Sequence, residues 1–418
     1  MNSSEIKIKH DPFAALRIKE FIFFLTSRFF LTLAIQMQGL IVGLQIYKHT
    51  KDVLALGMIG LAEAIPFIIV SLFAGHVADN MNRKYIIILS TSLLIICTAS
   101  LLYFSLDTSL VIQTFGTFPV YIVIAFIGVI RGFVAAATPS FMSQIVPREM
   151  YANAATWNST FWHIASIVGP AVGGFICMIS LATAYAVDVV LIVISVICFF
   201  FIASKPLPTK VKKESLSESL SVGIKFVFSN QLILGALSLD LFAVLFGGAI
   251  SMLPAYTDKI LHVGAAEFGL LRAAPAFGAV IMALIIAYKP LTKNAGRSLL
   301  ISVGVFGIST ILFGISTNFY LSLFFLFLTG AFDNVSVVIR HTILQLSTPD
   351  EMRGRVSAVN SIFIGSSNEI GSFESGVAAR AMGLKPSVVF GGVMTILIVA
   401  LTAKVAPKLR ALNLKSLH

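Results

Sequence analysis

The sequence predicts an all-α integral membrane protein in which twelve transmembrane helices form two six-helix bundles. Of its 418 residues, 57% are hydrophobic and only 12% are charged, and the mean hydropathy is +0.94. The hydrophobic share is about 238 residues, close to the roughly 240 that twelve spans of about 20 residues require. This composition excludes a soluble globular enzyme, a disordered chain and a secreted disulfide scaffold.

Long apolar runs follow one another along the whole chain. Continuous runs of this length indicate helices rather than the short alternating strands of a transmembrane barrel. We expect the helices at residues 21–46, 55–77, 85–104, 119–142, 152–178, 182–203, 231–256, 267–287, 299–316, 319–344, 356–382 and 388–406. A polar stretch, 204–221, separates the first six from the last six. It predicts an N-terminal bundle at 1–203, a cytoplasmic linker at 204–229 and a C-terminal bundle at 230–418.

The distribution of lysine and arginine predicts the orientation. If the N-terminus is cytoplasmic, 21 of the 30 basic residues fall in inside segments, five fall outside and four lie within helices. The positive-inside rule therefore places both termini in the cytoplasm. The net charge of +11 is explained by this bias, so no nucleic-acid partner is expected. The first apolar run is too long for the core of a signal peptide.

An internal repeat relates the two halves. The thirteen residues 147–159 align with residues 349–361 at an offset of 202, with five identities, and residues 61–66 align with 270–275 at an offset of 209. Two parallel six-helix repeats are one of the layouts found in secondary transporters, and they predict pseudo-twofold symmetry between the bundles.

Four stretches carry a resemblance to a known family. They are residues 55–66 leading into 75–84, residues 169–174, the run that begins at Asp240, and residues 353–361 leading into 367–376. The chain resembles a major facilitator superfamily transporter, and it is most similar to the branch of enterobactin (siderophore) exporters and macrolide-efflux-like proteins. The resemblance covers nearly the whole chain. It implies a bacterial plasma (inner) membrane location and a protein that works as a monomer.

The resemblance also implies two motifs with mechanical roles. The loop between the second and third helices is expected to close the cytoplasmic side against the start of the eleventh helix, and residues 169–174 are expected to act as a pivot in the fifth helix. The gating residues are Gly75, Asp79, Arg83, Lys84, Arg353 and Arg355, and the pivot residues are Gly169, Pro170, Gly173 and Gly174. Asn80 and Asn82 depart from the loop signature, which usually has a basic residue and a glycine there.

Charged residues inside the predicted helices are candidates for coupling, because a charge at mid-bilayer costs about 3 kcal/mol on insertion scales. A carboxylate in a low-dielectric cavity can bind and release a proton as solvent access alternates. The candidate proton carriers are Asp240, Glu374, Glu369 and Asp333. For each, a satisfied structural carboxylate is the alternative. Asp188, near the outer end of its helix, is expected to be interfacial or structural.

Repeat-equivalent positions carry charges of opposite sign in three cases. The pairs are Arg131 with Asp333, Glu63 with Arg272, and Arg28 with Asp240. Because symmetry places equivalent positions across the central cavity, these pairs predict an electrostatic latch between the bundles. The alternatives are that each charge pairs within its own half or faces a lipid headgroup, or that Arg131 binds an anionic substrate directly.

These observations favour a proton-coupled exporter of an amphipathic small molecule, such as a siderophore or a macrolide-like drug, that works by alternating access. The alternatives are an importer or facilitator of a small polar solute, and a lipid flippase or membrane enzyme on the same fold. No metal-ligand cluster, Walker loop or catalytic constellation is visible in the sequence. We therefore expect no enzyme activity, no metal and no cofactor, with protons as the energy source and membrane lipid as the surroundings.

Overall fold

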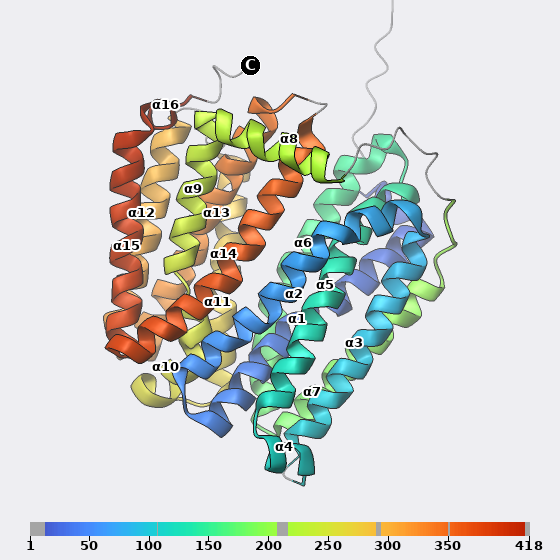
Figure 1. The fold of residues 1–418 in the computed structure, drawn as a ribbon, viewed down its shortest axis with the longest axis vertical. Coiled ribbons are helices and arrows are strands. Elements are labelled where there is room, and N and C mark those ends of the chain that lie inside the picture. Colours follow the sequence, from blue (N-terminus) through green and yellow to red (C-terminus); the bar gives the residue numbers. More distant parts are fainter. Residues whose placement is uncertain (1–12, 107, 207–215, 290–293, 350–351, 414–418) are drawn as a thin grey trace, which may run out of the picture.

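The computed structural model describes residues 13–106, 108–206, 216–289, 294–349 and 352–413. Within these residues the chain is helical and contains no β-strand. The helices form two bundles that lie side by side (Figure 1). Each predicted apolar run corresponds to a helical segment, so the predicted all-α membrane fold is confirmed.

The N-terminal bundle contains six long helices and the short helix α4. They are α1 (Lys19–Thr50), α2 (Val53–Asn80), α3 (Arg83–Ser105), α4 (Leu110–Phe115), α5 (Phe118–Ile145), α6 (Tyr151–Cys177) and α7 (Leu181–Phe200), with single 3-10 turns at Ala15–Arg17 and Arg148–Met150. Polar caps fix several starts: Asp52 accepts a hydrogen bond from the Leu54 amide at 3.0 Å, and Ser180 accepts one from the Thr183 amide at 2.9 Å.

The C-terminal bundle repeats this plan with one interruption. Its helices are α9 (Gln231–Phe246), α10 (Leu253–Tyr256), α11 (Ala265–Tyr288), α12 (Ala295–Ile315), α13 (Phe319–Ser347), α14 (Arg353–Met382) and α15 (Leu384–Val405). The prediction of one continuous helix at 231–256 is wrong in the middle of that range. The helix breaks after Phe246 at Gly247 and Gly248, and continues as a 3-10 turn, α10 and a π-helical turn at Thr257–Leu261. Two adjacent glycines favour the break, because glycine weakens a helix interior.

The packing pattern is the same in both bundles. The second long helix packs on the fourth in each, as α2 on α5 and α11 on α13. The third packs on the fourth and on the sixth, and the two bundles meet where α2 packs on α14 and α6 packs on α11. This is the arrangement expected from the internal repeat.

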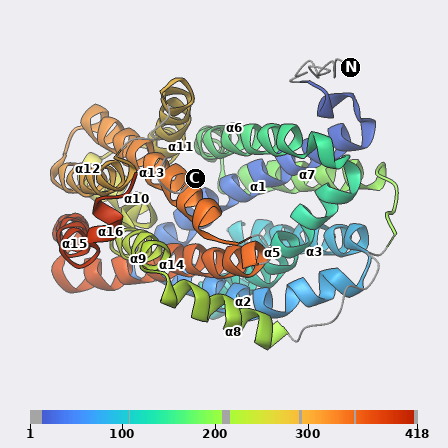
Figure 2. The ribbon, with the colours of Figure 1, turned by 90° about the horizontal axis from the view of Figure 1, so that it is seen from above.

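Two ends of the molecule are distinguished by their short helices. At one end, which we call the α8 end, lie the start of α1, the helix α8 (Leu216–Ser229) and α16 (Pro407–Arg410) (Figures 1 and 2). At the other, the α4 end, lie α4, α10 and the turn between α1 and α2. Helix α8 lies in the segment predicted as a linker, and its contacts are with α9 and α14.

Eleven of the described helical segments are long and apolar enough to cross a membrane. Helix α14 has 30 residues and lies among them, but it is more polar than the others. A helix of this length that faces protein on several sides can carry polar residues, because they avoid lipid. The chain is therefore a multi-pass membrane protein.

Candidate functional site

The centre of the interface between the bundles holds four charged side chains. Glu63 comes from α2, Arg131 from α5, Arg272 from α11 and Glu369 from α14. Arg131 forms an ion pair with Glu63, and both Arg131 and Arg272 lie close enough to Glu369 to interact with it electrostatically. The Arg131 side chain is 37% exposed and that of Glu63 is 17% exposed, so the group remains accessible.

The latch predicted between Arg131 and Asp333 is wrong in this conformation, because Arg131 pairs with Glu63 inside its own bundle. The physical reason is the close packing of α2 on α5. Gly128, one turn before Arg131, lies directly against the backbone of Glu63. Pairing within one half was the alternative, and it is the arrangement observed.

Arg272 extends from the C-terminal bundle to the N-terminal bundle. Its Nη2 atom lies 2.9 Å from the position that a Cβ atom on Gly39 of α1 would occupy. The absence of a side chain at Gly39 therefore makes room for the guanidinium. Arg272 forms no ion pair with Glu63 among the described residues; its anionic neighbour is Glu369.

Asp240 forms an ion pair with Arg340 of α13, so the predicted pairing of Asp240 with Arg28 is also wrong. Both partners are buried, with side-chain exposures of 8% for Asp240 and 3% for Arg340. Removing one partner of a buried ion pair is destabilising, because it leaves an uncompensated buried charge. Asp240 is thus paired in this conformation, and its role as a proton carrier stays a prediction.

Two of the predicted proton carriers have no ion-pair partner among the described residues. They are Asp333 in the middle of α13 and Glu374 in the last third of α14. Glu374 lies beside Ser375, which packs against Gly248 at the break between α9 and α10. Arg28 of α1 likewise has no ion-pair partner there, and its Nε atom is buried without a hydrogen bond.

The loop motif at residues 75–84 closes the end of α2 and begins α3. Asn82 caps α3 by accepting a hydrogen bond from the Lys84 amide at 3.0 Å, and its side chain donates to the Ser204 hydroxyl at 2.6 Å. This explains why an asparagine can replace the usual glycine. Arg83 donates to the carbonyl of Ala78 at 3.1 Å.

Other members of the predicted gating set are only partly described. A Cβ atom on Gly75 would meet nothing within 4 Å. The side chains of Asp79 and Arg353 lie outside the described residues, and Arg355 packs at the point where α8 approaches α14. Contact between the loop and the start of α14 therefore stays a prediction.

The glycine-rich segment of α6 packs against two helices at once. Gly169 and Gly173 face α1, where their missing side chains make room for Gln36 and Met37. Gly174 faces α11, and a Cβ atom there would lie 2.8 Å from the Cα of Gly269. Pro170 lies inside α6 without ending it. The segment thus allows a close approach of the two bundles, where α6 packs on α11.

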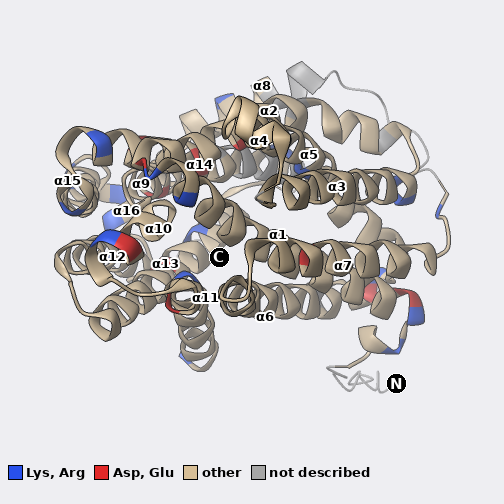
Figure 3. Cartoon of the chain, turned by 90° about the horizontal axis from the view of Figure 1, so that it is seen from below, with Lys and Arg blue, Asp and Glu red and all other residues tan. Residues whose placement is uncertain are grey.

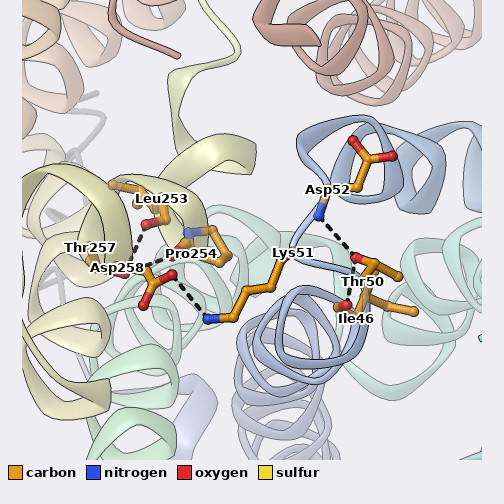
Figure 4. Close-up of polar contacts among 8 residues, drawn as sticks. All are labelled: Ile46, Thr50, Lys51, Asp52, Leu253, Pro254, Thr257 and Asp258. Atoms are coloured by element: carbon orange, nitrogen blue, oxygen red, sulfur yellow. Dashed lines mark hydrogen bonds and ion pairs between the residues drawn. The ribbon is translucent and has the colours of Figure 1, made fainter. Parts of the chain in front are cut away.

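Ion pairs across the bundles occur at the α4 end, and sequence reasoning missed them. Lys51 Nζ lies 3.0 Å from Asp258 Oδ2 (Figure 4), and Arg380 Nη1 lies 3.3 Å from Asp52 Oδ2. The adjacent residues Lys51 and Asp52 thus bind opposite charges of the other bundle. The sequence signal is this pair of adjacent opposite charges in the short turn between α1 and α2.

The α4 end is closed, whereas the bundle axes diverge toward the α8 end (Figure 1). Besides the two ion pairs, a Cβ atom on Gly57 of α2 would lie 3.0 Å from the Cα of Gly376 of α14. Seen from the α4 end, charged residues are few on the helices (Figure 3). Within the described residues, no cluster of three or more His, Cys, Asp or Glu is placed to hold a metal ion.

Comparison with known proteins identifies the family. Residues 10–418 match the family described as transmembrane secretion effector. The chain belongs to this family, and it is a transporter of the major facilitator superfamily. Curated relatives include the enterobactin exporter EntS of Shigella boydii serotype 18, 24% identical over 342 residues that cover 80% of this chain and 79% of the relative. EntS of Citrobacter koseri is 25% identical over 349 residues, with the same coverage.

Solved structures share the fold at low sequence identity. A POT family transporter bound to 5-aminolevulinic acid superposes with a TM-score of 0.71 at 12% identity, covering 93% of this chain and 96% of that one. A bacterial homologue of the lysosomal transporter Spinster, in an inward-facing and unoccupied conformation, gives 0.67 at 14% identity, covering 96% and 98%. These likenesses concern the fold.

Proposed function

We propose that the protein is a proton-driven exporter of an amphipathic small molecule of the siderophore or macrolide class, and that it works by alternating access. The observation that carries the proposal is that Asp333 of α13 and Glu374 of α14 have no ion-pair partner among the described residues, whereas Glu63 and Asp240 are each paired with an arginine. A carboxyl group inside the membrane without a cationic partner has a high energetic cost. Such groups are found where a protein binds or relays protons.

The relatives and the proposed orientation support export as the direction of transport. The curated relatives are named as enterobactin exporters, and the basic residues favour both termini in the cytoplasm of a bacterial inner membrane. With that orientation, the closed α4 end faces outward, and the conformation described is inward-facing. Such a state receives substrate from the cytoplasm, as an exporter requires.

The four-charge group formed by Glu63, Arg131, Arg272 and Glu369 is the proposed point of contact with substrate. Its side chains come from both bundles, so a molecule bound there touches both halves of the alternating mechanism. It offers two cations and two anions, which suits an amphipathic molecule with hydrogen-bonding groups better than a simple ion.

A lipid flippase is the second candidate, and one observation favours it. An apolar cavity of about 480 Å³ lies on the flank of the interface between α6, α11 and α13, lined by residues such as Ala171, Phe277 and Phe324. Phe277 and Phe324 are 50% and 52% exposed. An acyl chain would fit such a surface.

Reconstituted vesicles separate these functions. The probe is enterobactin, and the expected result is proton-gradient-driven movement of enterobactin into vesicles loaded with acidic buffer, abolished by a protonophore. A fluorescent phospholipid serves as the second probe. If the gradient moved neither enterobactin nor macrolides while the phospholipid crossed the bilayer, the exporter proposal would be wrong and the flippase would replace it.

A further inference from the structure

A polar layer lies deep inside the N-terminal bundle, where α1, α3 and α7 pack together. Asp188 of α7 is fully buried there, so of the two expected roles, interfacial or structural, its burial fits the structural one. The side-chain amide of Gln38 donates to Asp188 Oδ2 at 3.2 Å and to the Thr98 hydroxyl at 2.7 Å. The second carboxyl oxygen, Oδ1, is buried without any hydrogen-bond partner.

No lysine or arginine of the described residues pairs with Asp188. The groups that face it are Gln38 from α1 and Thr98 from α3, with Tyr185 one turn away on α7 and Cys177 beside Tyr185 as the titratable neighbours. A lone charged carboxylate in such surroundings is strongly disfavoured, so the group is neutralised instead. A divalent cation would need about six oxygen ligands, more than this layer offers.

A second polar layer lies one to two turns nearer the α4 end. The Tyr185 hydroxyl donates to Gln45 Oε1 at 2.6 Å, and Gln45 Nε2 is buried without a partner. Gln45 is two turns from Gln38 on α1, and Tyr185 is one turn from Asp188 on α7. The two layers therefore stack on the same helix faces.

A cavity of about 550 Å³ lies beyond the second layer, at the α4 end. Its lining continues the same helix faces, with Lys48 on α1, Ser105 on α3, Leu181 on α7 and the neighbouring Cys177. The ion pair between Lys51 and Asp258 lies at this cavity. Cys177 both lines the cavity and lies beside Tyr185, so the cavity adjoins the second layer.

We propose that Asp188 is a proton-binding site within the N-terminal bundle, and that it exchanges protons with the α4 side through Gln45 and Tyr185. We call these two polar layers and the cavity the proton column. The two polar layers lie inside the N-terminal bundle, so the ion pairs that close the interface at the α4 end do not cross them, whereas the cavity is lined by residues of both bundles. A proton can thus bind from the α4 side while the bundles are closed there to substrate. Its role in coupling rests on the proposed proton-driven transport, but proton binding is measurable without any substrate.

Infrared difference spectroscopy on the purified full-length protein in lipid tests the binding step. Protonated carboxyl groups give a carbonyl band that ionised ones lack. We expect Asp188→Asn to lose one such band. Glu374→Gln is the matched control, because it removes a carboxyl of the other bundle and leaves the Asp188 band in place. If wild type and Asp188→Asn gave the same carboxyl bands at all pH values, the proposal would be overturned.

Hydrogen–deuterium exchange of the same band tests the route and leaves Asp188 intact, so it works even if Asp188→Asn misfolds. Tyr185→Phe combined with Gln45→Leu should slow exchange by about tenfold or more, since tenfold needs only about 1.4 kcal/mol of added barrier. Tyr103→Phe is the control, because Tyr103 is 43% exposed on the outside of α3. Equal rates in the double variant and wild type would refute the column. Failure of gradient-driven export alone would change neither spectroscopic result, so the two proposals fail separately.

Discussion

Replacing Asp240 by asparagine should destabilise the C-terminal bundle, because it leaves Arg340 charged and without its partner. The structure sets the magnitude: the side chains are only 8% and 3% exposed, so solvent cannot take over the role of the carboxylate. Breaking a buried ion pair by removing one partner costs about 3–5 kcal/mol. For a unit of about 200 residues, 1 kcal/mol shifts the melting temperature by roughly 2–4 °C, which predicts a drop on the order of 10 °C.

The same substitution at an exposed ion pair serves as the reference for the size of the loss in melting temperature. Asp258→Asn removes the partner of Lys51, but these side chains are 46% and 58% exposed. Exposed pairs contribute about 0–1 kcal/mol, so this variant should melt within a few degrees of the wild type. Both substitutions replace an aspartate by asparagine; the pairs differ in burial, in the cation and in whether they join one bundle or two.

Heating the solubilised protein and measuring the surviving monodisperse fraction by size-exclusion chromatography provides the assay. The double variant Asp240→Asn with Arg340→Gln should recover most of the loss, because it removes the uncompensated charge. If Asp240→Asn melted together with Asp258→Asn, the buried pair would not be structural. Asp240 would then again be a candidate proton carrier.

Three further predictions concern the interface. Arg131→Ala and Glu63→Ala should be non-additive by about 0.5–3 kcal/mol in a double-mutant cycle on stability, whereas Arg131→Ala and Asp333→Ala should add; the opposite pattern would restore the latch. Glu374→Gln should keep its melting temperature but flatten the pH dependence of transport in vesicles, and an unchanged pH profile would exclude it as a proton carrier. Gly174→Val should separate α6 from α11 and accelerate maleimide labelling of cysteines introduced at the α4 end; unaltered labelling would contradict the role of this contact.

The sequence predicted the helices well because membrane spans are defined by long apolar runs, a local property. Prediction from apolar runs missed two features. Helix α8 was assigned to a polar linker, although residues 222–228 carry apolar side chains at helical spacing. The break after Phe246 interrupts a run that stays apolar throughout, so hydropathy alone gives no sign of it, and the signal was the adjacent Gly247 and Gly248.

The charged residues of the site were predictable, but their pairing was not. Any charge inside an apolar run stands out because of its cost in lipid. Repeat alignment then gives equivalent depths for Arg131 and Asp333, but it does not say which neighbouring helix each side chain faces. Glu63 lies closer to Arg131 because α2 packs directly on α5, and such contacts between helices come from the tertiary structure.

Strong and weak ion pairs are distributed in a way that suits alternating access. The buried pair of Asp240 and Arg340 holds helices of one bundle together, and it need not break when the bundles rock. The pairs at the α4 end cross between the bundles and are exposed, so each contributes at most about 1 kcal/mol. Two conformations interconvert readily only if they differ by a few kcal/mol. A buried pair at the α4 end would hold it shut, whereas exposed pairs beside close glycine contacts let it open.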